Sequence, residues 1–212
     1  MVDPFRPDLD WLGAWIIGRA FARGLPLPFR DRGGWRAEIG SDSEQRRWLF
    51  DSLSPDFIAL ARQISEPGNN LRAFCEGGAM RAVLPERWEV GAPSYAMTVT
   101  DAARSGEIPD GFRLELRTDR RSAHAAILTP DGELTASGHA GIGDSAFVYD
   151  RIVTRPGFER RGLGTAIMHA LGKAVPSAAM PQILVATEAG CALYQRLGWK
   201  IVSPYSSANL KV

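Results

Sequence analysis

The residues best placed to do chemistry lie in a glycine-containing turn that reads Arg160-Arg161-Gly162-Leu163-Gly164-Thr165. Glycine has no Cβ, so a phosphate can approach the backbone amides at positions 162 and 164 closely. The first amides of a helix lack intrahelical partners, and the helix dipole favours negative charge there. The two arginines add charged donors that suit phosphate oxygens. The turn predicts a phosphate-binding site, and a solvated surface turn is the alternative.

The flanking segments predict the strand and the helix that position this turn. Residues 146–154 are β-branched and aromatic, which favours a strand, and Arg155-Pro156-Gly157 ends it. After the turn, apolar residues recur with a helical period; they are Leu163, Ile167, Ala170, Leu171 and Ala174. A strand, a glycine turn and a helix together present free amides to an anion.

With this arrangement the chain resembles the GCN5-related N-acetyltransferases, the GNAT superfamily. That family carries Arg/Gln-x-x-Gly-x-Gly/Ala at the turn after its fourth strand, where the amides hold the pyrophosphate of acetyl-CoA. Here residues 159–164 read Glu-Arg-Arg-Gly-Leu-Gly, so both glycines and the preceding arginine match. Glu159 departs from the pattern. Because a carboxylate repels a diphosphate, Glu159 is not assigned to the cofactor.

A second motif downstream strengthens the resemblance. The family ends this region in a pattern like Asn-x-x-Ala-x-x-Leu-Tyr-x-x-Leu-Gly-Phe. Here residues 187–199 read Thr-Glu-Ala-Gly-Cys-Ala-Leu-Tyr-Gln-Arg-Leu-Gly-Trp, with Thr187 for the asparagine and Gly190 for the alanine. Residues 182–187 predict a strand, and residues 188–197 predict a helix that Gly198 ends.

The resemblance implies where acetyl-CoA binds and which residue supplies a proton. The pantetheine would pair with the backbone of Ile152, Val153 and Thr154 like an added strand, where the fourth and fifth strands splay apart. The pyrophosphate would lie on the amides of Arg160, Arg161, Gly162, Leu163, Gly164 and Thr165. Tyr194 matches the family tyrosine that donates a proton to the coenzyme A thiolate. A tyrosine packed only for its ring area is the alternative.

The general base is less well defined. Asp150 is the candidate, because the family often uses a carboxylate on or near this strand; a salt bridge to Arg151 or Arg155 is its alternative role. The fallback candidates are His124, His139 and Asp144. His169 lies on the helix after the turn and is expected to be solvated. No group of histidines or carboxylates has the spacing of metal ligands, so no metal is expected.

The fold class expected for residues 93–212 is α/β (α+β), a GNAT-like mixed and mainly antiparallel sheet with flanking helices. Strands are predicted at 95–99, 112–117, 123–128 and 134–142, the last two joined by an Asp131-Gly132 turn. The two helices that the family inserts after its first strand are not evident between 100 and 111. Residues 203–207 are expected to form a surface tail, with a substrate-lining role as the alternative.

Residues 1–92 are expected to form a small N-terminal α/β unit that carries no recognisable chemical motif. A helix is predicted at 8–23, strands at 34–39, 45–50 and 71–75, and a second helix begins at Ser54-Pro55. Trp11 and Trp15 have large apolar side chains that we expect to be buried against another surface. That cover is either the C-terminal sheet, where this unit would help wall the acceptor pocket, or a second copy in a homodimer.

The composition narrows the classes of partner. The chain has 212 residues, an apolar fraction of 45% and a net charge of +1, so it can bury a core but gives no electrostatic argument for nucleic acid or acidic membranes. No apolar run has the length of a membrane span, and the N-terminus does not resemble a signal peptide. Cys75 and Cys191 are expected to be reduced thiols, as in a cytoplasmic protein.

The function expected from the resemblance is an N-acetyltransferase that moves an acetyl group directly from acetyl-CoA to a primary amine of a small-molecule or peptide acceptor. Two other classes stay open. One is a GNAT-like sensor that binds acyl-CoA without transferring it, and the other is an interaction module that uses the tryptophan-rich N-terminus. Turnover distinguishes the enzyme from the sensor, and affinity for acetyl-CoA distinguishes both from the interaction module.

Overall fold

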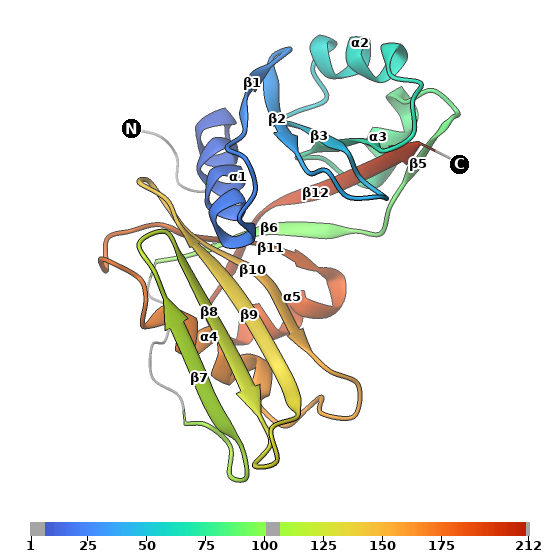
Figure 1. The fold of residues 1–212 in the computed structure, drawn as a ribbon. Helices are drawn as coiled ribbons and strands as arrows, with labels where there is room; N and C mark the ends of the chain where they lie inside the picture. Colours follow the sequence, from blue (N-terminus) through green and yellow to red (C-terminus); the bar gives the residue numbers. More distant parts are fainter. Residues whose placement is uncertain (1–6, 101–106, 211–212) are drawn as a thin grey trace.

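The computed structural model describes residues 7–100 and 107–210. The helices are α1 (Leu9–Arg23), α2 (Pro55–Gln63), α3 (Gly77–Val83), α4 (Leu163–Gly172) and α5 (Glu188–Arg196). The strands are β1 (Phe29–Asp31), β2 (Gly34–Glu38), β3 (Arg46–Phe50), β4 (Asn69–Ala73), β5 (Trp88–Val90), β6 (Ser94–Val99), β7 (Arg113–Thr118), β8 (Ser122–Leu128), β9 (Leu134–Ile142), β10 (Phe147–Thr154), β11 (Gln182–Thr187) and β12 (Lys200–Leu210). Their spatial order is β1-β2-β3-β4-β12-β6-β11-β10-β9-β8-β7, with β5 beside β12 (Figure 1).

The C-terminal part of the chain builds the sheet that carries the glycine turn. β7, β8, β9 and β10 are antiparallel neighbours in chain order, and β11 then joins β10 in parallel. A parallel neighbour needs a crossover connection, which α4 provides. The fold class predicted from the sequence, a mixed and mainly antiparallel sheet with flanking helices, is confirmed.

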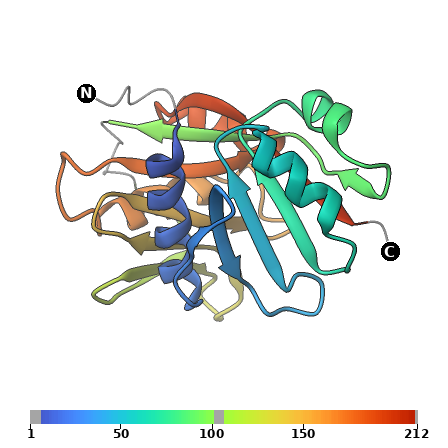
Figure 2. The same cartoon turned by 90° about the horizontal axis from the view of Figure 1, so that it is seen from above.

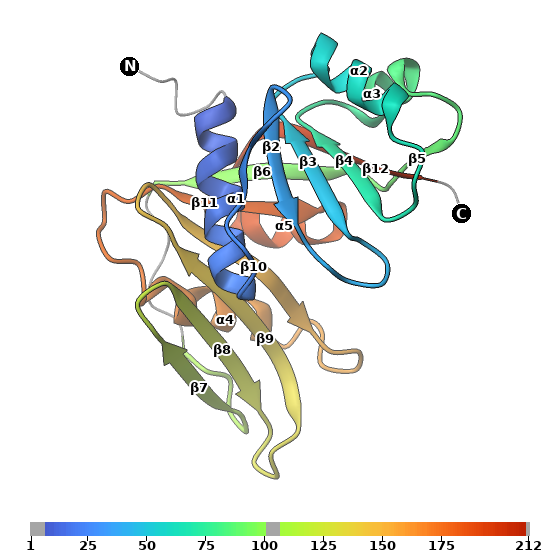
Figure 3. The ribbon, with the colours of Figure 1, turned by 45° about the horizontal axis from the view of Figure 1, so that its top comes forward.

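Alternation along β10 assigns the helices to opposite faces of this sheet. Phe147 and Tyr149 belong to the core that includes α4 and α5, whereas Ala146 and Val148 belong to the core that includes α1. Figures 1 and 3 show α1 on the near face of the sheet, and α4 and α5 on the far face. The strand before the glycine turn therefore contacts both helical layers.

The N-terminal part forms a second α/β unit. β1, β2 and β3 are antiparallel neighbours, and β4 joins β3 in parallel after the crossover through α2. α2 and α3 cover its outer face (Figure 2), over a core that includes Trp48, Phe57 and Met80. Its inner face is turned toward α1, since Ala37 and Leu49 pack with Trp15 and Ile16.

β12 connects the two units and corrects one prediction. Residues 200–205 pair with β6, and residues 206–210 pair with β4 and β5, so one strand runs through both parts. The expected surface tail at 203–207 is wrong, because Tyr205 and Ser206 are buried. The polar composition of this segment suggested exposure, but a buried polar side chain can form its hydrogen bond within the protein. Here the Ser206 hydroxyl donates to the Cys75 carbonyl at 2.7 Å.

Packing of α1 on the C-terminal sheet covers Trp15 within the chain and Trp11 in part. Trp15 is buried with its ring edge-on to Tyr205, at 5.4 Å between centroids. Two glycines permit a close crossing of α1 over β9, since a Cβ on Gly141 would collide with the carbonyl of Gly18. The burial of Trp15 therefore gives no argument for a dimer seam, whereas Trp11 is half-buried, with its ring edge-on to Phe74.

The other predicted elements are observed with small shifts, and three short ones were missed. The helix at 8–23, the Ser54-capped helix and the strands around the glycine turn are confirmed, while the strand predicted at 71–75 begins earlier, at Asn69. β1, α3 and β5 have 3, 7 and 3 residues, too few for a periodic pattern. Residues 107–112 contain no helix; residues 101–106, where the family inserts helices, lie outside the described residues.

Candidate functional site

The site begins where β10 and β11 separate. The two strands pair only through Phe147 with Gln182 and Val148 with Ile183, after which β11 continues beside β6 alone. β10 continues to Thr154, paired with β9 on its other side. The backbone groups on the open side of β10 can therefore accept an extended ligand as an added strand. Ile152, Val153 and Thr154 lie on this open stretch.

A bulge shapes this stretch of β10. The register with β9 shifts between Asp150 and Val153, and Arg151 adopts a left-handed φ of 52°. A non-glycine residue in that conformation costs about 1–3 kcal/mol, and such strain is concentrated at functional sites. Within the bulge, Ile152 packs into the α4 core, whereas Asp150, just before it, faces α1. The sequence carries no signal for this bulge.

The glycine turn enters α4 through a left-handed residue and without a side-chain cap among the described residues. Gly162 is the residue before α4 and has a φ of 78°, and no side chain caps the first amides of the helix. Arg160 is also left-handed, with a φ of 59°. The amides at the start of α4 are thus available to a ligand, and the positive end of the helix faces it.

A cavity of about 800 Å³ lies between the glycine turn and α5. Its lining on the turn side includes Thr154, Arg160, Gly162, Leu163, Gly164 and Thr165. On the α5 side it includes Ala189, Leu193, Arg196 and Leu197. The volume is in the range of natural ligand sites. Arg196 adds a positive charge that sequence reasoning missed, because on a predicted helix it is indistinguishable from a solvated arginine.

Gly164 controls the depth of this cavity. A Cβ at this position would lie 3.1 Å from Cδ2 of Leu193 and 3.7 Å from Oγ1 of Thr154, and both residues line the cavity. Any larger residue would therefore fill the space between α4 and α5. Arg161, also predicted to contact the cofactor, stacks over the ring of Phe158 with 5.3 Å from Cζ to the centroid, and it is not among the lining residues.

The two departures from the family motifs have local structural roles. The Glu159 carboxylate accepts a hydrogen bond from the Gly157 amide at 2.7 Å, so it stabilises the loop that leads into the turn, although it also borders the cavity. The Thr187 hydroxyl accepts from the Gly190 amide at 3.2 Å and caps α5, which is what an asparagine would do there.

Tyr194 lies on α5 with its ring in the core, in contact with Trp199. Its hydroxyl forms no hydrogen bond to any residue that the structure describes, so it is free to donate to a ligand. Burial raises the pKa of Tyr194 to about 12, and the charge of Asp150 adds to the rise. The hydroxyl consequently stays protonated at every physiological pH.

Asp150 is held by two arginines from α1 and not by Arg151 or Arg155, the partners considered from the sequence. Nε and Nη2 of Arg23 donate to the two carboxylate oxygens at 2.5 and 2.9 Å, and Nε of Arg19 donates at 3.2 Å. Burial alone would raise the pKa of Asp150, but the hydrogen bonds and charges of Arg23 and Arg19 hold it below its ordinary value. A carboxylate in this state accepts a proton weakly.

The fallback candidates for a base do not line the glycine-turn cavity. His124 and His139 are cross-strand neighbours with ring centroids 4.5 Å apart, beside Asp150 on the α1 face; burial, then the His124 charge, lowers the pKa of His139. Asp144 is exposed and pairs with Arg121. The prediction that His169 is solvated is wrong: it is buried, and neither ring nitrogen has a partner among the described residues.

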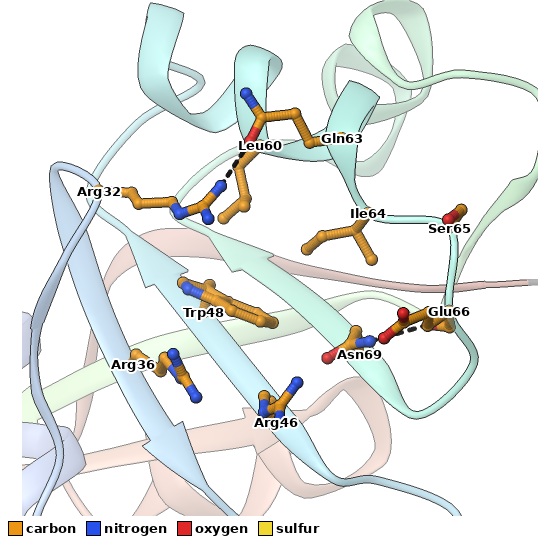
Figure 4. Close-up of a pocket in the computed structure, with 10 residues that line it drawn as sticks. All are labelled: Arg32, Arg36, Arg46, Trp48, Leu60, Gln63, Ile64, Ser65, Glu66 and Asn69. Carbon is orange, nitrogen blue, oxygen red and sulfur yellow. Dashed lines mark hydrogen bonds between the residues drawn. The ribbon is translucent and has the colours of Figure 1, made fainter.

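A second cavity, of about 260 Å³, lies on the outer face of the N-terminal unit (Figure 4). Arg32, Arg36 and Arg46 line it together with Trp48 and Asn69. Its arginines have partners: Arg36 pairs with Asp31 and Glu38, and Arg32 donates to Gln63 at 2.5 Å. It lies on the far side of β3 from α1 and is separate from the glycine-turn cavity.

Three other observations concern the described residues as a whole. No group of histidines, cysteines and carboxylates among them could hold a metal ion. No helix in residues 7–100 and 107–210 is both long and apolar enough to span a membrane. Cys75 and Cys191 are both unpaired.

Comparisons with known proteins agree with this geometry at the level of fold. No protein-family model matches the chain, and no curated protein matches it. A GCN5-related N-acetyltransferase from Kribbella flavida is similar with a TM-score of 0.59, at 14% identity and over 92% of each chain. A GCN5-related N-acetyltransferase-like protein from Streptococcus suis 89/1591 has a TM-score of 0.60 at 13% identity, over 88% of this chain and 89% of that one.

A third similar structure is a tandem GNAT protein from the clavulanic acid biosynthesis pathway. Its TM-score is 0.56 at 12% identity, with 84% of this chain and 78% of that chain covered. The similarity thus extends well beyond the C-terminal half, where the two motifs lie. The chain has the fold of the GCN5-related N-acetyltransferases over nearly its whole length.

Proposed function

We propose that the protein transfers an acetyl group from acetyl-CoA to a primary amine. The observation that carries the proposal is the cavity between the glycine turn and α5, which adjoins the open side of β10. A pyrophosphate needs free amides and positive charge, and a pantetheine needs unpaired strand backbone. Both occur in one continuous region of this chain.

The residues present fit acetyl-CoA. The amides of residues 162–165, with Arg160 and Arg196 beside them, would hold the phosphates, and the backbone of Ile152, Val153 and Thr154 would hold the pantetheine amides. Gly164 keeps the space between α4 and α5 clear for the ligand. When bound, acetyl-CoA supplies an acetyl group activated as a thioester.

Transfer requires movement of protons as well as of the acetyl group. The acceptor nitrogen forms a bond to the acetyl carbon while the carbon–sulfur bond breaks; the nitrogen loses a proton and the sulfur gains one. Tyr194 holds its proton at neutral pH and has no competing hydrogen bond in the described chain, so we assign it the role of acid. Asp150 remains the carboxylate nearest in sequence to the open strand, but its ion pairs favour a role in holding Arg19 and Arg23 over that of base.

A binding module that does not transfer is the second candidate. The observation in its favour is the same ion pair, because it leaves no unpaired carboxylate on β10 to accept the proton of the amine. Transfer does not need a carboxylate base if the acceptor amine enters already deprotonated or loses its proton to water.

A thiol-release assay with acetyl-CoA and a panel of primary amines and peptides tests the proposal. Release with at least one acceptor, lowered about 10²-fold or more in Tyr194→Phe, supports transfer with the tyrosine as acid. Calorimetric binding of acetyl-CoA without thiol release for any acceptor favours the binding module. If the protein shows no acetyl-CoA binding and no thiol release, both candidates are contradicted.

A further inference from the structure

A cluster of buried arginines lies between the two units, beside the open stretch of β10. Its first part is the ion pair of Asp150 with Arg19 and Arg23. Asp150 comes two residues after the last pair between β10 and β11, so the cluster lies at the start of the gap between these strands. It occupies the face of the sheet opposite the glycine-turn cavity.

The second part comes from the inner face of the N-terminal unit. Arg47 forms a bidentate pair with Glu44, and Nη2 of Arg72 lies 3.6 Å from the same carboxylate. Arg47 lines one small void together with Arg19 and Arg23, and burial together with the charges of Arg23 and Arg72 lowers the pKa of Arg19, against the charge of Asp150. The two parts therefore form one electrostatic unit.

Positive charge is in excess in this cluster. Each of its four arginine side chains is at most 16% exposed, and each of its two carboxylate side chains is at most 13% exposed. The members are Arg19, Arg23, Arg47 and Arg72 with Asp150 and Glu44. Buried charges in proteins are normally paired, because an unpaired one loses its hydration without compensation.

Some donors of the cluster have no partner in the described part of the chain. Nε of Arg19 bonds Asp150, but its terminal Nη atoms have no hydrogen bond, and the hydroxyl of Tyr205 has none. Both side chains are largely buried, at 15% exposed for Arg19 and 7% for Tyr205, and the Arg19 guanidinium stacks over the Trp15 ring with 5.3 Å from Cζ to the centroid. The void that Arg19 shares with Arg47 has about 10 Å³, room for one water and not for a carboxylate or a phosphate. An anion bound by the cluster would therefore have to enter through the gap between β10 and β11.

The cavity in Figure 4 provides a contrast. There Arg36 and Arg46 pair with carboxylates of their own unit, Asp31 and Glu38. Arg32 donates to the side-chain amide of Gln63, as Figure 4 shows. Those residues lie on a solvent-facing surface and need no ligand to balance their charge. Nε of Arg36 is buried there without a hydrogen-bond partner among the described residues, but its side chain is 26% exposed. The cluster between the units differs in that each of its charged side chains is at most 16% exposed and positive charge is in excess.

We propose that this cluster binds an anionic group, a carboxylate or a phosphate, of the acceptor amine. The inference rests on the proposed acetyl transfer and narrows its acceptor to amines that carry negative charge. Arg19, Arg72 and Tyr205 would donate to the anion, while Asp150 and Arg23 hold Arg19 in place. A guanidinium suits both carboxylate and phosphate oxygens, so the cluster alone does not distinguish them.

Matched pairs of amines test this inference. 4-Aminobutyrate is compared with butylamine for the carboxylate, and phosphoethanolamine with ethanolamine for the phosphate, by the ratio of kcat/KM in thiol release. We expect the anionic member of one pair to be preferred by about tenfold or more, the scale of one charged hydrogen bond. Arg72→Gln and Tyr205→Phe should reduce this preference several-fold, chiefly through KM.

The variants are chosen so that folding does not obscure the result. Arg19→Gln also breaks the pair with Asp150, so Arg72→Gln and Tyr205→Phe carry the test, each with its thermal midpoint measured. Arg117→Gln, at a side chain that is 82% exposed on β7, is the matched control and should leave the preference unchanged.

A readout that needs no turnover separates this inference from the proposed function. Binding of 4-acetamidobutyrate and N-butylacetamide is measured by calorimetry in the presence of coenzyme A. If no amine is acetylated but 4-acetamidobutyrate binds better and Arg72→Gln weakens it, the transfer proposal fails and the anion site stands. Equal turnover or equal binding of charged and neutral members, or no binding of either, overturns the anion site.

Discussion

The two faces of the sheet around β10 are built in different ways. On the α4 and α5 face, the cavity is formed by residues 154–165 and 189–197, which are close in sequence and use backbone amides and glycines. On the α1 face, the polar cluster joins side chains more than a hundred residues apart, such as Arg23 and Asp150 with a separation of 127. The first face suits a ligand common to a whole fold, because backbone groups vary little. The second depends on side chains, which can vary with the acceptor.

Because the α1 face of the sheet is covered by residues of the N-terminal unit, we expect each unit to need the other for its stability. A chain that lacks residues 1–92 loses α1, exposes the apolar face that contains Val148 and Ile183, and leaves half of β12 unpaired. We expect it to be insoluble or to lose its cooperative unfolding transition, as measured by sedimentation and circular dichroism. A soluble monomer with full activity would show that the α1 face contributes neither stability nor function.

Breaking the ion pair across the units should have the largest effect of any single substitution. Asp150→Ala leaves Arg19 and Arg23 without their buried partner, and removal of one member of a buried pair costs about 3–5 kcal/mol of unfolding free energy. Urea denaturation measures it. Asp144→Ala, whose carboxylate is 87% exposed in its pair with Arg121, is the control and should cost about 0–1 kcal/mol.

The same pair should make stability depend on acid pH. The folded state holds the pKa of Asp150 below its unfolded value, so its contribution is present above the unfolded pKa, about 3.9. It is lost as the pH falls below that value and through the lower folded pKa. Between about pH 5 and about pH 2, the free energy of unfolding should therefore decrease more in the wild type than in Asp150→Asn. Parallel curves would exclude a stabilising ion pair.

Tyr194→Phe tests the chemistry assigned to the α5 face. The ring stays and the hydroxyl has no partner in the described protein, so unfolding free energy should change little, by about 0.5 kcal/mol or less. Turnover should fall by about 10²-fold with coenzyme A affinity retained. Turnover near that of the wild type would show that the tyrosine is structural or that another acid replaces it.

Gly164→Val tests the space between α4 and α5. Its Cβ would lie 3.1 Å from Leu193, so the branches would enter the cavity. We expect coenzyme A affinity to fall by about tenfold or more, at least ~1.4 kcal/mol, with the fold retained. Calorimetry measures the coenzyme A affinity. Gly157→Ala, in the loop before the turn, is the control: because Gly157 has a left-handed φ of 86°, this substitution should lower stability and leave the affinity unchanged. Unchanged affinity in folded Gly164→Val would contradict the assigned site.

His169 should give the smallest effect. Burial lowers its pKa, and its two ring nitrogens lack partners among the described residues. The unfolded chain therefore binds a proton more readily, so stability falls as the pH drops below the unfolded pKa, about 6.5. His169→Leu should remove this dependence and stabilise the protein by up to about 1 kcal/mol. A stability loss on substitution would indicate a partner for the ring.

The sequence predicts the α4 and α5 face of the sheet better than it predicts the α1 face. Gly162, Gly164 and Tyr194 belong to local motifs, and the strand, turn and helix around them follow from periodicity over adjacent residues. The partners of Asp150 lie on a helix whose stripe predicts a buried face but not what it covers. The bulge at Arg151 and the long path of β12 likewise depend on tertiary pairing that no local pattern encodes.

The most direct test of the account is a crystal structure of the full chain with coenzyme A. We expect the pyrophosphate within hydrogen-bond distance of the amides of residues 162–165 and the pantetheine beside the backbone of residues 152–154. The thiol should lie in the gap between β10 and β11, within reach of the Tyr194 hydroxyl. Coenzyme A bound at another place, or no binding at saturating concentration, would contradict the central claim that this cavity is the cofactor site.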